Sequence, residues 1–166
     1  MISLALAMIA ADIPLWKNIE AGMTVEQVRE LYPEQKGKRP DGKKLQVEHN
    51  EKNTELHGFI DVGKCRPRVE IMHPNGKVTE VVIWMQARGA FSPMCADDAR
   101  SMALTKFGTP LTRDDDHTYE VIGGQVEQEE LTWVVDGVTV TFEHESYKDR
   151  WSLTYSAAPA GEDSAF

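Results

Sequence analysis

Hydrophobic residues recur at helical spacing early in the chain. This spacing predicts a helix over residues 25–32 that buries Val25, Val28, Leu31 and Tyr32, with Pro33 ending it. Thr24 and Gln27 have the spacing of a capping box, in which the threonine hydroxyl accepts from a backbone N–H and the glutamine side chain reaches back. The first residues of this helix therefore carry a specific structural signal.

Strand-like segments follow this helix. They cover residues 45–49, 56–62, 68–73 and 78–86, and Pro74-Asn75-Gly76 predicts a hairpin between the last two. Successive side chains of a strand point to opposite faces of a sheet. This alternation predicts one buried set, made of Val69, Ile71, Val81, Ile83 and Met85.

A second helix is predicted over residues 92–107. Ser92-Pro93 is typical of a helix start, and Gly108 is suited to a left-handed cap. Its buried side should contain Cys95, Ala96, Ala99, Met102, Ala103 and Phe107. An acidic turn at 113–116 and strands at 118–122, 130–135, 138–143 and 151–156 should follow, with Asp136-Gly137 joining the middle pair.

The last three of these strands alternate cleanly between apolar and polar residues. The apolar set should pack under the second helix and leave a polar face rich in hydroxyl groups. It consists of Leu131, Trp133, Val135, Val138, Val140, Phe142, Trp151, Leu153 and Tyr155.

The two halves of the chain share one order of elements. The sequence therefore predicts an α+β fold of two tandem repeats, each a helix and four antiparallel strands, with the helices packed on one sheet face. The predicted boundaries are an N-terminal segment at 1–11, a first repeat at 12–90, a second repeat at 91–157 and a disordered tail at 158–166. Either one continuous sheet or two separate sheets fits this order.

This order resembles the tandem helix-plus-four-strand fold of the β-lactamase inhibitor proteins. The motif Gly22-Met23-Thr24-x-x-x-Val28 is similar to the helix start of small outer-membrane assembly lipoproteins that share the half-fold. The resemblance in element order covers roughly residues 14–157, and it implies a non-catalytic protein that binds another protein. The chain has no lipobox cysteine near its start, and no inhibitor contact residue matches by motif.

Trp84 is predicted to lie on the sheet face that the helices leave open. An aromatic side chain beside a methionine and an arginine, ringed by polar groups, is typical of an interaction hot spot. We therefore predict a partner-binding set of Trp84, Met72, Arg68, Glu70 and Val82. In the alternative, the two repeats or the N-terminal segment cover Trp84.

The net charge and the composition of the N-terminal segment restrict which kinds of partner and which cellular compartment we expect. The 166 residues carry a net charge of -9, from 27 acidic and 18 basic side chains, which repels nucleic acid and anionic membrane surfaces. The apolar run at 2–11 is shorter than the roughly 20 residues of a membrane-spanning helix but has the length of a signal-peptide core. We expect a periplasmic or secreted protein without a transmembrane span; a buried segment in a cytoplasmic protein is the alternative.

Cys65 and Cys95 allow a single intramolecular pairing. In an exported protein they would form a disulfide between a loop of the first half and the first turn of the second helix. In a cytoplasmic protein they would be two buried thiols.

Common catalytic motifs are missing from the sequence. It contains no glycine-rich phosphate loop, no Gly-x-Ser-x-Gly elbow and no His-Glu-x-x-His helix, so we predict no enzymatic activity and no cofactor. The alternative is an enzyme, or a metal- or small-ligand-binding protein. Its site would lie at the acidic turn Asp114-Asp115-Asp116-His117 or at the histidines of the first half, His49, His57 and His73.

Overall fold

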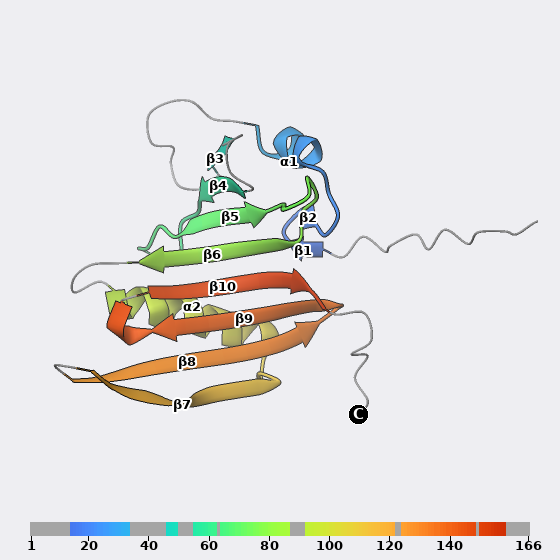
Figure 1. Ribbon diagram of the computed structural model, residues 1–166. Helices are drawn as coiled ribbons and strands as arrows, with labels where there is room; N and C mark the ends of the chain where they lie inside the picture. Colours follow the sequence, from blue (N-terminus) through green and yellow to red (C-terminus); the bar gives the residue numbers. More distant parts are fainter. Residues whose placement is uncertain are drawn as a thin grey trace, which may run out of the picture.

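An antiparallel sheet is the frame of the molecule (Figure 1). The computed structural model describes residues 14–33, 46–49, 55–62, 64–86, 92–121, 124–148 and 150–158. Within these residues the sheet has eight strands, in the spatial order β3 (Gln46–His49), β4 (Glu55–Phe59), β5 (Arg68–Met72), β6 (Glu80–Gln86), β10 (Arg150–Ala157), β9 (Val138–Glu145), β8 (Gly124–Val135) and β7 (Thr112–Val121).

The two halves of the chain meet at the centre of this sheet. β6 and β10 pair antiparallel, with Ser152 opposite Trp84 and Thr154 opposite Val82. The sheet is therefore continuous across the boundary predicted at residue 90. The predicted α+β class with an antiparallel sheet is confirmed.

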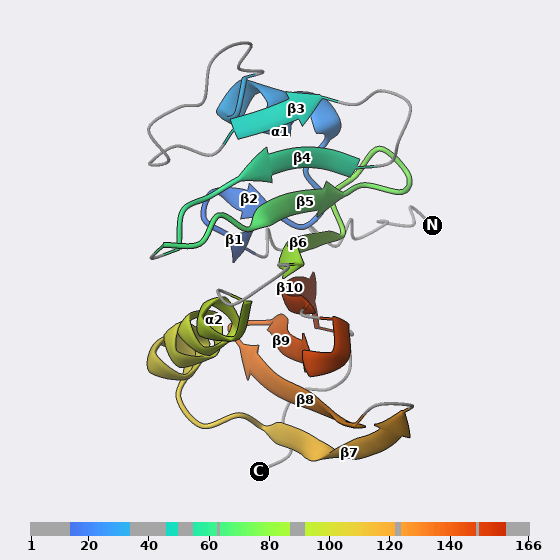
Figure 2. The ribbon, with the colours of Figure 1, turned by 90° about the vertical axis from the view of Figure 1, so that its left-hand side faces the viewer.

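Two elements cover one side of the sheet (Figure 2). Helix α2 (Ser92–Phe107) contacts β9 and β10, and the hairpin of β1 (Pro14–Trp16) and β2 (Ile19–Glu20) contacts β6 and β10 through β1. The small side chains of Ala96, Ala99 and Ala103 are buried, so the helix backbone can approach the sheet closely.

The hydrophobic core lies between the sheet and these covering elements. The sheet contributes most of the alternate residues that the sequence predicted, but Met85 and Val135 are only partly buried. Trp133, Trp151 and Phe142 are the largest of the fully buried side chains. The β1–β2 hairpin adds Leu15, Trp16 and Ile19, which the sequence analysis did not assign to any element. A three-residue strand and a two-residue strand are too short for alternation to identify them.

Helix α1 (Val25–Leu31) begins as predicted. The Gln27 backbone N–H donates to Thr24 Oγ1 at 3.3 Å, and the Thr24 N–H donates to Gln27 Oε1 at 2.8 Å, which completes the capping box. Val28 is fully buried, but the predicted burial of Leu31 is wrong because its side chain is 42% exposed. A helix of seven residues presents little more than one side chain to the core.

Helix α2 departs from its predicted pattern at one position. Met102 is 41% exposed, whereas Cys95, Ala96, Ala99 and Ala103 are buried as expected. The buried stripe of this helix is made of small residues, so the long Met102 side chain at its margin reaches solvent instead of the sheet. Gly108, at φ +77°, ends the helix and donates its N–H to the Leu104 carbonyl at 2.9 Å.

The predicted acidic turn at 113–116 is wrong. These residues belong to β7, which pairs Asp114 with Glu130 of β8 and contains an irregularity between Asp114 and His117. β7 and β8 each begin six residues earlier than predicted, at Thr112 and Gly124. Their polar sequences lack apolar alternation, and backbone pairing between the two strands provides the hydrogen bonds that form them.

A disulfide joins the two halves on the covered side. Cys65, in the segment before β5, is bonded to Cys95 of α2, with 5.9 Å between their Cα atoms. Both residues are buried, at 3% and 2% exposure. The bond therefore anchors the start of α2 to the first half of the chain.

Candidate functional site

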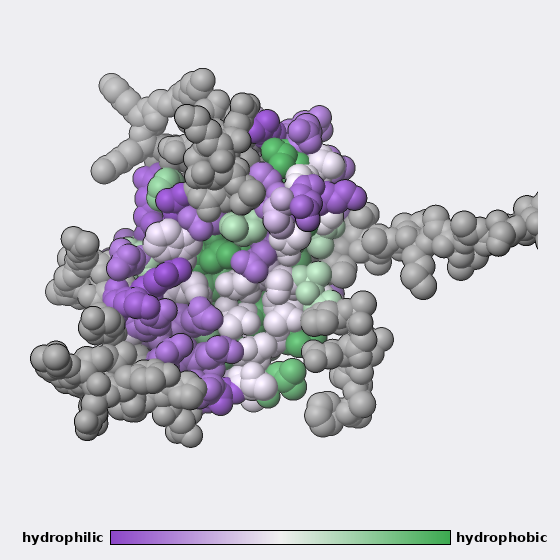
Figure 3. Space-filling view, viewed as in Figure 1, coloured by the Kyte–Doolittle hydropathy of each residue, from purple (hydrophilic) through white to green (hydrophobic). Residues whose placement is uncertain are grey.

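The side of the sheet opposite α2 carries no covering element among the described residues (Figure 3). We call this side, from β5 to β8, the open face. The register places on it Arg68, Glu70, Met72, Glu80, Val82, Trp84, Gln86, Arg150, Ser152, Thr154, Ser156, Thr139, Thr141, Glu143, Glu145, Gln128, Glu130, Thr132 and Val134. In the space-filling view, strongly hydrophilic residues gather toward one border and paler residues fill the middle.

The open face is ordered in rows that run across the strands. One row reads Arg68, Trp84, Ser152, Glu143 and Glu130, each residue directly opposite the next on the neighbouring strand. Directly opposed side chains on one face lie about 5 Å apart at Cβ. The aromatic, hydroxyl and charged groups of this row are therefore direct neighbours, although five strands supply them.

Trp84 lies between two guanidinium groups. The Cζ atom of Arg68 is 5.9 Å from the ring centroid, and that of Arg150 is 5.4 Å from it. Both distances fall in the range of a cation–π contact. Arg68 also forms an ion pair with Glu70 at 2.9 Å, which fixes its side chain beside the ring.

Carboxylates lie on both sides of β10. Glu143 and Glu130 are directly opposite each other on β9 and β8, an arrangement of like charges that destabilises a sheet. Ser152, only 6% exposed, donates its hydroxyl to Glu143 Oε2 at 3.2 Å. On β6, burial and then the Glu143 carboxylate raise the pKa of Glu80 above its ordinary value.

Hydroxyl groups occupy the adjacent row. Thr154, Thr141, Thr132 and Thr112 stand directly opposite one another on β10, β9, β8 and β7. Each offers a methyl group and a hydroxyl that can donate or accept a hydrogen bond. This part of the open face can therefore meet either apolar or polar groups.

The structure brings together all five residues of the predicted partner-binding set. Arg68 is opposite Trp84, Glu70 is opposite Val82, and Met72 lies on the same face of β5. The β1–β2 hairpin lies on the other side of the sheet, so this part of the N-terminal region does not cover Trp84. Sequence reasoning missed Arg150, because only the register of β10 against β6 places it beside the tryptophan.

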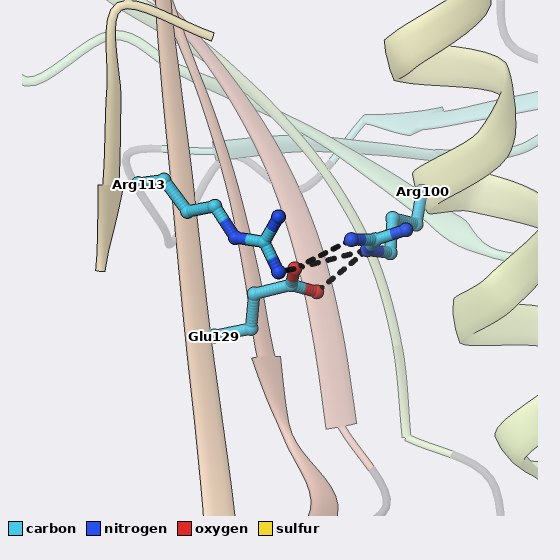
Figure 4. Close-up of polar contacts among 3 residues, drawn as sticks. All are labelled: Arg100, Arg113 and Glu129. Atoms are coloured by element: carbon cyan, nitrogen blue, oxygen red, sulfur yellow. Dashed lines mark hydrogen bonds and ion pairs between the residues drawn. The ribbon is translucent and has the colours of Figure 1, made fainter. Parts of the chain in front are cut away.

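A second charged cluster fastens α2 to the sheet on its covered side (Figure 4). Arg100 of α2 donates from Nε to both carboxylate oxygens of Glu129, at 3.0 and 2.8 Å, and from a terminal nitrogen to Oε1 at 2.9 Å. Arg113 of β7 lies farther away, at 3.9 Å. The Arg100–Glu129 pair is bidentate and partly buried, so this cluster is a structural contact between the helix and the strand.

The predicted alternative sites lie largely outside the described residues. The side chains of 115–117, His49 and His57 lie outside the described part, and the register pairs His57 with Glu70 but His49 with Leu56, in different rows. His73 follows β5. Where side chains are described, no three His, Cys, Asp or Glu residues gather as a metal site would require.

Comparison with known proteins gave no matching family model, no matching curated protein and no matching solved structure. In the part of the chain that the structure describes, neither helix has the length and apolar character needed to cross a membrane.

Proposed function

We propose that this chain is a non-catalytic module that binds another protein chain through its open face. The observation that carries the proposal is the position of Trp84 between Arg68 and Arg150 at the centre of the sheet. Tryptophan and arginine are the residues most often found at the energetic centre of protein interfaces. Here one ring and two guanidinium groups share a site that no described element covers.

The neighbouring side chains support the same role. Met72 and Val82 add apolar surface beside Trp84, and both are only partly buried in the chain alone. The surrounding threonines, serines and carboxylates form the polar rim that such interfaces have around a central anchor. A catalytic role would require convergent reactive groups, and the open face instead presents a broad surface.

The order of the strands supports the proposed resemblance to tandem helix-plus-four-strand proteins. In chain order, α1 precedes β3 to β6, and α2 precedes β7 to β10. Each series crosses its half of the sheet from the outer edge to the centre, where β6 meets β10. Two series that end at the same central pair are what a duplicated unit would produce, and they build one wide face.

The disulfide supports a periplasmic or secreted location. Cys65 and Cys95 are bonded, and no cysteine in the described chain is free. Disulfides of this kind persist in oxidising compartments and are rare in the cytoplasm. The proposed partner is therefore sought among exported or envelope proteins.

Replacement of Trp84 tests this proposal. The wild-type chain and Trp84→Ala are immobilised and exposed to an envelope extract of the source organism, with Met102→Ala as the matched control because Met102 is exposed on α2, on the opposite side of the sheet. We expect Trp84→Ala to lose a captured protein that wild type and Met102→Ala retain. Identical sets of captured proteins for all three chains would refute the proposal.

A further inference from the structure

One row of the open face carries opposite charges at matching places about β10. Arg68 lies on β5 and Glu130 on β8, while Arg150 lies on β10 itself and Glu70 and Glu80 lie on the same side of β10 as Arg68. Arg68 is two strands from β10 on one side, and Glu130 is two strands from β10 on the other, in the same row. This row is complementary to itself when the face is turned about β10.

We infer that the protein docked on the open face is a second copy of this chain, placed face to face about a two-fold axis parallel to β10. This inference rests on the proposed function and names its partner. Such an axis keeps every row and exchanges the two sides of the sheet, so Arg68 of one copy faces Glu130 of the other. By symmetry each contact is made twice.

The outer rows of the face match in the same way. Met72 comes opposite Val134 of the second copy, which pairs two apolar side chains, one of them 45% exposed in the single chain. Glu80 comes opposite Thr139 of the second copy, which pairs a carboxyl acceptor with a hydroxyl donor. On these flanking strands no row opposes two charges of the same sign, whereas on β10 itself Arg150 and Ser152 each come opposite their own counterpart in the second copy.

Arg150 completes the central contact. Its guanidinium leans from β10 over Trp84, and its direct neighbour on β9 is Glu145. The axis brings Glu143 of the second copy opposite Trp84, and thus next to this guanidinium. Between the two copies, Arg150 would pair with Glu143 and Arg68 with Glu130. These ion pairs would offset the repulsion between Glu143 and Glu130 within each copy.

The size of the face is compatible with a weak dimer. The face is five strands wide, at about 4.8 Å per strand, and extends about 20 Å along the strands. Contact over this face buries on the order of 1,000 Å², counted over both copies. This area is at the lower end of specific protein interfaces. We therefore expect a monomer–dimer equilibrium with a dissociation constant of about 1–100 μM, a range typical of small, polar contacts.

Charge reversal in the full chain tests the inference. Sedimentation equilibrium of the oxidised protein is measured over a concentration series, with circular dichroism confirming that each variant is folded. We expect Arg68→Glu and Glu130→Arg each to raise the dimer dissociation constant about tenfold or more, and the double variant to restore it, because like charges then face each other only in the single variants. Arg150→Glu with Glu143→Arg is a second, independent pair.

Each outcome decides a separate question. A monomer at every concentration that still captures another protein through Trp84 overturns the second-copy inference and leaves the proposed function intact. A monomer that captures nothing overturns both. A dimer that neither charge-reversal pair weakens also overturns the inference, because its interface then lies elsewhere on the chain.

Discussion

The guanidinium of Arg150 lies over the ring of Trp84, 5.4 Å from its centroid, although β10 and β6 come from opposite halves of the chain. This contact crosses the strand pair that joins the halves. It therefore links the proposed docking centre to the continuity of the sheet.

The Arg150 to Trp84 contact should be measurable as a coupling. We expect Arg150→Ala to lower the free energy of unfolding by about 0.5–1 kcal/mol, the range of cation–π contacts at exposed sites. In a Trp84→Leu background the same change should cost less, because its aromatic partner is gone. A double-mutant cycle by urea denaturation measures the difference, and equal costs in both backgrounds would exclude a specific contact.

Arg100 and Glu129 should hold α2 on the sheet. Glu129→Ala leaves the partly buried Arg100 without its bidentate carboxylate, and we expect a loss of about 1–3 kcal/mol in the free energy of unfolding. Arg113→Ala is the control, because that side chain is 54% exposed and 3.9 Å from Glu129, and it should cost less than about 0.5 kcal/mol. Equal effects of the two changes would contradict this assignment.

Loss of the disulfide should destabilise the chain without changing its sheet. Cys65 and Cys95 are separated by 30 positions, and the loop-entropy model predicts a cost of about 3–4 kcal/mol when the bond is removed. We expect the Cys65→Ala/Cys95→Ala variant to melt at a lower temperature, with an unchanged far-ultraviolet dichroism spectrum at low temperature. A reducing agent should lower the melting temperature of wild type and leave that of the variant unaltered.

Glu80 should make stability depend on pH. Burial and the Glu143 carboxylate raise its folded-state pKa above the ordinary value, so the folded chain binds this proton more tightly than the unfolded chain. Its contribution to stability is therefore present below the ordinary carboxyl pKa and is lost as pH rises through the raised pKa.

Glu80→Gln removes this titration. We expect the melting temperature of the variant to fall less than that of wild type as pH rises through that window, and to be at least as high as that of wild type at neutral pH. Melting curves at constant ionic strength provide the measurement. A steeper decline in the variant than in wild type would show that another group is responsible.

Alternation and turn chemistry predicted much of this fold from the sequence. The capping box at Thr24 and the cap at Gly108 were correctly placed because both depend on local backbone geometry. The buried sets of β5 and β9, and that of β6 except for Met85, also followed from period-two patterning. The extension of β7 over Asp114 could not be predicted in this way. That part of β7 has no strand-like composition, and it is stabilised by its pairing with β8.

The candidate site could be predicted only in part. Trp84 and Arg68 were predicted to share the open face because their strands are consecutive and a hairpin fixes their register. Arg150 and Glu143 could not be placed beside them, since the pairing of β10 with β6 joins segments far apart in the sequence. Long-range register of this kind depends on the packing of the whole core.

Site-specific photo-crosslinking tests the central claim, that the open face docks protein, most directly. A photoreactive phenylalanine analogue replaces Val134, which is exposed on the open face, or Met102, which is equally exposed on α2, and each chain is illuminated in its native host. We predict a discrete protein adduct from position 134 and none from position 102, and its mass distinguishes a second copy from another protein. No adduct at 134, or the same adducts from both positions, would contradict the account.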